Sequence, residues 1–319
     1  MLMERKNFLK IAGLASVSVS TPGLVKAMLL QSEPRAKSLF DISLAEWSLH
    51  RHIFDGKIDH LEFAETTKNE FGITAVEYVN QFFTDKVNDP SYLDEMNSRC
   101  DDLGVEQLLI MVDGEGDLAV TDQQKRIEAV ENHYKWVEAA EYLGCHSIRV
   151  NTYGDGSPHE QKQAAVDGLG RLAEFAKDYG INIIVENHGG YSSDAQWLGE
   201  VMRQVAMDNC GTLPDFGNFC IKREGGARWE GECVEEYDRY QGVKEMMPFA
   251  KGVSAKSYAF DKRGQETTID FKKMIQIIHE AGYNGYIGIE YEGDALSEFE
   301  GIKATKKLLL DIRAQLDAG

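Results

Sequence analysis

Three segments decide how this sequence folds: IIVENHGG (residues 183–190), GTLPDFGNF (211–219) and YIGIEYEG (286–293). Each contains an apolar run of the kind that forms a buried strand, and each run leads to a carboxylate: Glu186, Asp215 or Glu290. Carboxylates that converge in a protein interior repel one another unless a cation or a proton lies between them. The three segments therefore predict an active site built at strand ends.

Apolar, β-rich runs recur at intervals that fit a strand, a crossover helix and two loops. Eight strands are predicted, at residues 40–44, 73–79, 107–112, 147–151, 181–186, 211–215, 252–257 and 286–290. Amphipathic helical patterns lie between them, at residues 92–103, 123–143, 160–179, 194–207 and 270–281. Eight such units predict an α/β protein, a single-domain (β/α)8 TIM barrel with its active site at the C-terminal strand ends. A doubly wound open sheet is the alternative, but the first strand-to-helix turn has no glycine-rich phosphate loop.

Composition narrows the class of partner. The chain has 319 residues, 43% of them hydrophobic, and a formal net charge of −19. This charge argues against nucleic acid and anionic membrane surfaces, which bind Lys and Arg. A small neutral sugar fits better, and an oligomer is left open. The five cysteines are odd in number and form no CxxC motif, so most of them are expected to serve packing.

The first 27 residues have the pattern of an export signal. Arg5, Lys6 and Lys10 precede a weakly apolar stretch, and Val25 and Ala27 are small residues suited to signal-peptidase cleavage. The string ERKNFLK is similar to the twin-arginine consensus, with Lys6 in place of the second arginine. The stretch is too short and too rich in Gly and Ser for a membrane span. Residues 28–319 are therefore expected to form a periplasmic barrel, or a cytoplasmic one if residues 1–27 are only a tail.

The strand-end motifs resemble those of the xylose isomerase-like TIM-barrel superfamily. This group contains sugar isomerases, ketose 3-epimerases, inosose dehydratases and apurinic endonucleases. The likeness runs from Phe40 to about Leu310. It implies that Glu186, Asp215 and Glu290 are ligands of a divalent metal, and that strand seven supplies a histidine two residues before a lysine.

The chain departs from that pattern on two strands. Ser254 stands where the strand-seven histidine is expected, although the lysine is kept as Lys256, and Asn218 replaces a histidine that commonly follows the strand-six aspartate. An oxygen-dominated site is better suited to Mg²⁺ or Mn²⁺ than to zinc. A metal-free site, in which the Lys256 ammonium neutralises the acids, is the second interpretation.

Further residues are candidates for substrate contacts. His188 follows Glu186 by two, so it is expected either to bind substrate and transfer protons or to be an exposed loop histidine. Arg149 and Asn151 either hold sugar hydroxyls or form a structural pair with an acid such as Glu77. Asn218 is assigned to substrate binding. Trp229 lies in a long segment, residues 221–241, which is either a lid that stacks on a sugar or a surface excursion leading into the next helix.

These residues predict an enzyme that works through an enediolate. The cation would polarise a carbonyl group, while Glu186 and Glu290 move protons with help from His188 and Lys256. The favoured function is a metal-assisted isomerase or epimerase of a neutral keto or aldo sugar. The alternatives are a lyase or hydratase acting on a 3-keto-glycoside or keto-sugar, and a noncatalytic sugar-binding barrel. An endonuclease would need additional histidine ligands and a basic groove, and the sequence offers neither.

Overall fold

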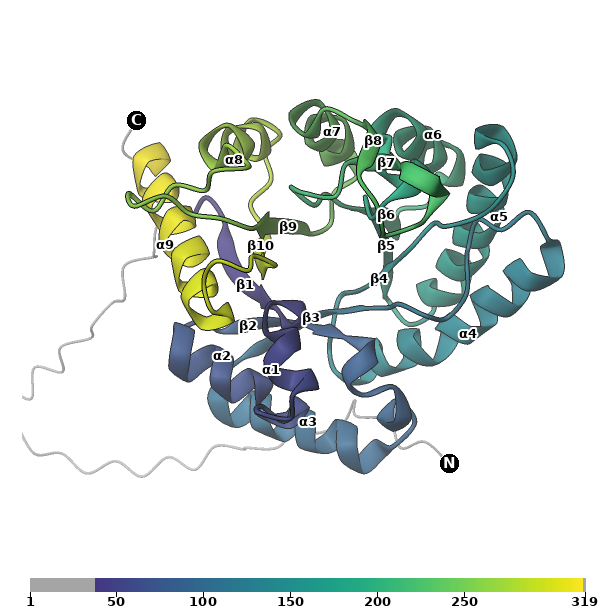
Figure 1. Cartoon of the computed structure of the whole chain (residues 1–319). Helices are drawn as coiled ribbons and strands as arrows, with labels where there is room; N and C mark the ends of the chain where they lie inside the picture. The colour runs from purple at the N-terminus through teal and green to yellow at the C-terminus, as the bar shows by residue number, and fades with distance from the viewer. Residues whose placement is uncertain (1–37, 318–319) are drawn as a thin grey trace, which may run out of the picture. The chain divides into compact units, whose positions relative to one another are not determined.

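The computed structural model describes residues 38–317, and Figure 1 shows parallel strands at the centre of a ring of helices. The barrel strands are β1 (Asp41–Ala45), β2 (Ala75–Val79), β3 (Glu106–Met111), β4 (Ser147–Val150), β5 (Asn182–Glu186), β6 (Cys210–Leu213), β9 (Val253–Ser257) and β10 (Tyr286–Tyr291). Each of the eight predicted strands is present, with ends that differ by one or two residues. The predicted (β/α)8 barrel is confirmed.

The strands are hydrogen-bonded in the order β6-β5-β4-β3-β2-β1-β10-β9, and all neighbours are parallel. Short bridges between β6 and β9 close the ring, pairing Thr212 with Ala250 and Asp215 with Ser254. The backbone amide of Ser254 donates to the Pro214 carbonyl oxygen at 2.9 Å. This closing seam places Asp215 directly beside Ser254.

Helices cover the outside of the barrel (Figure 1): α2 (Phe63–Phe71), α3 (Pro90–Leu103), α4 (Gln123–Tyr142), α5 (Pro158–Lys177), α6 (Ala195–Val205), α7 (Arg239–Met246), α8 (Phe271–Glu280) and α9 (Glu298–Asp317). The short helix α1 (His50–Phe54) follows β1 and buries none of its residues. Five of the covering helices begin after an aspartate whose carboxylate accepts first-turn amide hydrogens: Asp89, Asp122, Asp194, Asp238 and Asp270. Such caps satisfy donors that the helix itself leaves unpaired. The five predicted helices correspond to α3, α4, α5, α6 and α8.

The barrel interior is apolar below the acids. One buried cluster lies inside the ring of strands, formed by Ala45, Val79, Leu109, Met111, Ile184 and Leu213. Alternate residues of a strand face the same side, so Ile184 and Glu186 both point inward from β5. The acids therefore lie at the polar top of a filled barrel.

The Glu77 side chain of β2 is buried and lies next to Gly288 of β10. Ser43 Oγ donates to Glu77 Oε1 at 2.5 Å, whereas Glu77 Oε2 is buried without a hydrogen-bond partner. Burial raises the pKa of Glu77 to about 7. A Cβ atom built on Gly288 would lie 2.5 Å from Glu77 Oε1, which is closer than such atoms approach. Gly288 thus leaves the space that the Glu77 carboxyl group fills.

We expect Gly288→Ala to lower the free energy of unfolding by about 1–3 kcal/mol, because the new methyl group overpacks a filled interior. Urea unfolding followed by circular dichroism measures this change. Gly170→Ala is the matched control, since a Cβ atom there meets nothing within 4 Å and Gly170 lies inside helix α5. Alanine should stabilise that helix by up to about 1 kcal/mol. Equal unfolding midpoints for Gly288→Ala and the unmodified protein would show that Glu77 is not fixed across the barrel.

After β6 the chain forms two further strands before the next α-helix. Strands β7 (Cys220–Arg223) and β8 (Cys233–Glu236) form an antiparallel hairpin, and a disulfide joins Cys220 to Cys233. The later part of the predicted 221–241 segment does lead into a helix, α7. Sequence analysis assigned the cysteines mainly to packing, which holds for the three free ones, Cys100, Cys145 and Cys210, but not for this pair.

Two further predictions concern the export signal and membrane-spanning helices. The predicted export signal, residues 1–27, lies outside the described residues, so the periplasmic location stays a prediction. None of the helices between residues 38 and 317 is both long enough and apolar enough to cross a lipid bilayer.

Candidate active site

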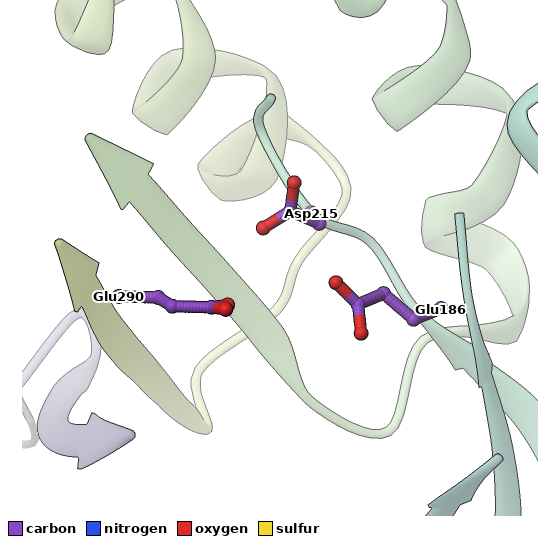
Figure 2. Close-up of side chains that lie close together, drawn as sticks. All are labelled: Glu186, Asp215 and Glu290. Atoms are coloured by element: carbon purple, nitrogen blue, oxygen red, sulfur yellow. The ribbon is translucent and has the colours of Figure 1, made fainter. Parts of the chain in front are cut away.

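Three carboxylates converge at the C-terminal end of the barrel, where Figure 2 shows them pointing toward one another. Glu186 ends β5, Asp215 lies two residues beyond β6, and Glu290 lies near the end of β10. One oxygen from each carboxylate lies within 4.8 Å of the others, and the three residues are 1%, 0% and 4% exposed, respectively. Buried carboxylates at this spacing require protons or a cation between them.

Ser254 connects two of the acids. Its Oγ lies 2.7 Å from Asp215 Oδ2 and 2.8 Å from Glu290 Oε2. A hydroxyl group has one proton to donate, so the second short contact needs a proton on a carboxyl group or a cation nearby. Burial, opposed by the charge of Lys256, raises the pKa of Asp215 to about 7, which favours such a proton. Ser254 thus fills the place of the expected histidine as a hydroxyl bridge.

Lys256 lies at one edge of the acid cluster. Its Nζ is 3.2 Å from Glu290 Oε1 and 3.1 Å from Glu292 Oε1. Burial alone would lower the pKa of Lys256, but the charges of Asp215, Glu290 and Glu292 raise it well above its ordinary value. The ammonium group therefore stays charged beside Glu290 and Glu292, and the space enclosed by the three acids is left to another cation or to protons.

Arg149 contacts Glu186 from β4. Its Nε lies 2.9 Å from Glu186 Oε2 at an angle that makes the contact an ion pair rather than a hydrogen bond, and its Nη1 donates to Asp113 Oδ1 at 2.9 Å. Sequence analysis left open a structural pair with an acid such as Glu77. The acids that Arg149 pairs with are Asp113 and Glu186.

His188 is held as a neutral imidazole. Asn151 Nδ2 donates to Asp113 Oδ1 at 2.6 Å, which orients the amide so that its oxygen faces His188 Nδ1 at 2.8 Å. An amide oxygen only accepts, so Nδ1 carries the proton and Nε2 is left as an acceptor. Burial, reinforced by the charge of Arg149, lowers the pKa of His188 to about 3. His188 is therefore not the exposed loop histidine of the alternative interpretation.

A cavity of about 800 Å³ opens above the cluster. Seven of the nine predicted site residues line it: Arg149, Asn151, His188, Asn218, Trp229, Lys256 and Glu290. The other two, Glu186 and Asp215, lie beneath its floor. Asn218 Nδ2 donates to Glu186 Oε1 at 2.9 Å. Glu290 is thus the member of the acid cluster that reaches the cavity.

The residues of the cavity wall that sequence analysis missed include Asp113, Tyr153 and Tyr258. Asp113 directly follows the predicted strand at residues 107–112, so the rule that found the other acids applies to it as well. Tyr258 follows Lys256 by two residues, the spacing that places side chains on one side of an extended strand. Tyr153 lies in a loop and carries no such signal.

Residues 68–312 match the family model described as the xylose isomerase-like TIM barrel. The chain belongs to this family. Two curated relatives are inosose dehydratases. The one from Serratia proteamaculans (strain 568) is 26% identical over 200 residues, which are 54% of this chain and 65% of the relative. The one from Lacticaseibacillus casei is 26% identical over 174 residues, 49% of this chain and 57% of the relative. The chain thus spans less than two thirds of the length of these relatives.

Solved structures share the fold of this xylose isomerase-like barrel. The IOLI protein with a bound zinc atom has a TM-score of 0.64 at 15% identity, covering 86% of this chain and 99% of that one. A D-tagatose 3-epimerase-like protein has a TM-score of 0.65 at 18% identity, covering 88% and 99%. A family protein from Mycobacterium smegmatis in complex with magnesium has a TM-score of 0.63 at 13% identity, covering 88% and 99%. At these identities the likeness shows the fold alone.

The acid cluster of this xylose isomerase-like barrel fits a divalent cation. Divalent cations of this kind bind carboxylate oxygens at about 2.0–2.6 Å, so oxygens that share one cation lie no more than about 5.2 Å apart. The oxygens of Glu186, Asp215 and Glu290 lie within 4.8 Å of one another, which is inside that limit. With Ser254 in place of an imidazole, the side chains around this space offer only oxygen donors.

Proposed function

We propose that the protein removes a proton beside the carbonyl group of a neutral keto-sugar or keto-cyclitol and then expels the β-hydroxyl group as water. The observation that carries this proposal is the pair formed by Glu290 and Lys256. A carboxylate base and an ammonium proton donor lie 3.2 Å apart in the cavity wall. The similarity to proteins named inosose dehydratase supports the same reaction.

Glu290 is the general base in this proposal. It lines the cavity, whereas Glu186 lies beneath the floor between Arg149 and Asn218. The two oxygens of Glu290 have different surroundings, because Oε2 faces Ser254 and Oε1 faces Lys256. Oε2 is therefore directed toward the acid cluster, while Oε1 lies beside the proton donor, Lys256 Nζ. A divalent cation held by Glu186, Asp215 and Glu290 would polarise the substrate carbonyl and make the neighbouring C–H more acidic.

Lys256 is the general acid. Glu290 takes the proton from carbon, the electron pair forms the enolate, and its collapse breaks the C–O bond at the β carbon. The departing hydroxide takes a proton from Lys256 Nζ and leaves as water, and Glu290 then returns its proton to the amine. Protonation of Glu290 removes a negative charge 3.2 Å from Nζ, so the ammonium gives up its proton more readily at that moment.

The charges of the cavity favour a neutral substrate. Arg149 pairs with Asp113 and Glu186, and Lys256 pairs with Glu290 and Glu292. Arg228 pairs with Asp117. These three cations are therefore already matched with carboxylates, and a phosphate group would have to compete with them. Arg223, which also lines the cavity, donates to the Gly231 carbonyl oxygen at 3.0 Å.

A sugar isomerase or epimerase is the second candidate. His188 lines the same cavity as a neutral imidazole with Nε2 left as an acceptor. Nε2 could carry a proton from one oxygen of the enediol to the other while Glu290 returns its own proton to the neighbouring carbon, so that no hydroxide is lost. This outcome is the one that sequence analysis favoured, and the D-tagatose 3-epimerase-like fold is compatible with it.

One experiment separates the two candidates. The protein is incubated in D₂O with Mn²⁺ or Mg²⁺ and with either an inosose or 3-keto-D-glucose, and products are followed by mass spectrometry and NMR. Dehydration gives a product lighter by one water, while isomerisation or epimerisation gives a sugar of unchanged formula with carbon-bound deuterium. We expect loss of water that stops when EDTA is added. If no probe loses water and none incorporates deuterium, the enzyme proposal is contradicted.

A further inference from the structure

The β7–β8 hairpin brings an exposed tryptophan to the cavity. The disulfide between Cys220 and Cys233 ties the two strands, and the connection between them carries Arg228 and Trp229. Trp229 is 49% exposed, yet it lines the cavity. A half-exposed indole in a cavity wall leaves apolar surface available to a ligand.

Trp229 is held against residues of the site from one side. Its ring centroid lies 4.5 Å from that of His188 and 5.7 Å from that of Tyr153, to which it is nearly perpendicular at 84°. The Tyr153 hydroxyl donates to the His188 carbonyl oxygen, so the two supporting rings are themselves joined. The indole therefore rests on these two rings, while about half of the residue stays exposed.

Arg228 fixes the hairpin connection to Tyr153 and to the loop after β3. Its guanidinium group lies 3.8 Å from the ring centroid of Tyr153 and donates to both carboxylate oxygens of Asp117, at 3.2 and 3.1 Å. Asp117 belongs to the loop after β3 and also lines the cavity. Together with the disulfide, these contacts hold Trp229 in place before any ligand arrives, which lowers the entropy cost of binding.

The cavity has more volume than one sugar ring fills. It extends from Glu290 and Lys256 to Asp117, Arg228 and Trp229, and its volume of about 800 Å³ lies in the upper part of the roughly 300–1,000 Å³ found for sites that bind drug-sized ligands. One sugar ring at Glu290 leaves much of that space free. The ring contacts of Trp229 are with His188 and Tyr153, whereas the pair proposed to act on the substrate is Glu290 and Lys256. The indole thus lines a different part of the cavity wall from that pair.

We propose that Trp229 forms an outer subsite for the second ring of a two-ring substrate, a glycoside whose keto-sugar ring lies at Glu290 and Lys256. The apolar face of the outer sugar or aglycone stacks on the indole. Arg228 and Asp117 line the same cavity and can contact the hydroxyl groups of that outer ring. The assignment of the inner ring rests on the proposed function. The subsite itself concerns binding and can be measured without turnover.

Binding of glycosides that carry no keto group tests the subsite. Isothermal titration calorimetry compares methyl β-D-glucoside, which has one ring, with three two-ring probes: methyl β-cellobioside, methyl β-maltoside and 4-nitrophenyl β-D-glucoside. At least one two-ring probe should bind roughly tenfold more tightly than the one-ring probe, the size expected for one stacked ring. Trp229→Ala should remove this gain while changing the one-ring affinity less than about twofold, and Trp229→Phe should keep part of it.

Val234→Ala is the matched control, because Val234 lies on β8 of the same hairpin, is 59% exposed and is not among the residues that line the cavity. It should leave every affinity unchanged, and thermal unfolding should show that all variants fold. A gain below threefold for every two-ring probe, including no measurable binding, overturns the subsite. So does a gain that survives in Trp229→Ala. Failure of the D₂O experiment would contradict the proposed reaction without altering these binding results, so the two proposals fail separately.

Discussion

Replacement of Glu290 by glutamine is expected to lower kcat for the keto-sugar by roughly 10²–10⁴-fold, the range attributed to a general base. Glutamine keeps the shape of the side chain but cannot take a proton from carbon. It also removes the charge that pairs with Lys256 at 3.2 Å. Initial rates of water loss and of deuterium incorporation should fall together, because both begin with the proton that Glu290 removes.

Two variants show whether this loss comes from proton transfer or from loss of the cation. Glu186→Gln removes the same charge from an acid that lies beneath the cavity floor. It should weaken Mn²⁺ binding in calorimetry and regain part of its activity at saturating Mn²⁺, whereas Glu290→Gln should stay inactive. Glu280→Gln, at the exposed end of α8, should behave like the unmodified protein. Equal recovery of the Glu186 and Glu290 variants with Mn²⁺ would assign both residues to the cation alone.

The fold and the acids could be predicted because both depend on short-range patterns. The strands β5 and β10 contain apolar runs, as parallel strands buried on both faces require, whereas β6 is short and only partly apolar. Glu186 and Glu290 lie at the ends of the two runs, and Asp215 lies just beyond β6. In a parallel barrel all such ends meet at one edge. Asp113 follows the same rule, because it comes directly after the run at residues 107–112, but it was not predicted as a site residue.

The pairing of side chains could not be predicted from these patterns. Whether Arg149 contacts Glu77 or Asp113 depends on side-chain direction across neighbouring strands, and the sequence carries no signal for it. The same is true of Ser254, whose bridge between Asp215 and Glu290 arises at the seam where β9 meets β6. With these contacts, Glu290 lines the cavity and Glu186 does not. The proposed reaction is therefore an elimination with one glutamate as base, rather than proton transfer between two glutamates.

Replacement of Lys256 by methionine is expected to separate the two halves of the proposed reaction. Without the ammonium, expulsion of the β-hydroxyl group should slow by roughly 10²–10⁴-fold, while Glu290 still removes the carbon-bound proton. Deuterium incorporation into recovered substrate should therefore persist when water loss has nearly stopped. The variant also leaves Glu290 buried without its partner, which should lower the free energy of unfolding by up to about 3–5 kcal/mol. Urea unfolding measures that cost, and Lys262→Met, at an exposed position, is the control for loss of a lysine charge.

Lys256→Arg distinguishes a proton donor from a structural charge. A guanidinium group keeps the positive charge beside Glu290 and Glu292, so this variant should recover stability relative to Lys256→Met. Arginine does not give up a proton at any pH that proteins tolerate, so water loss should stay slow. Recovery of both stability and water loss in Lys256→Arg would mean that the lysine acts only as a charge. The proton for the leaving hydroxide would then come from another group of the cavity wall, and the Tyr258 hydroxyl group would be the first to test, by substitution with phenylalanine.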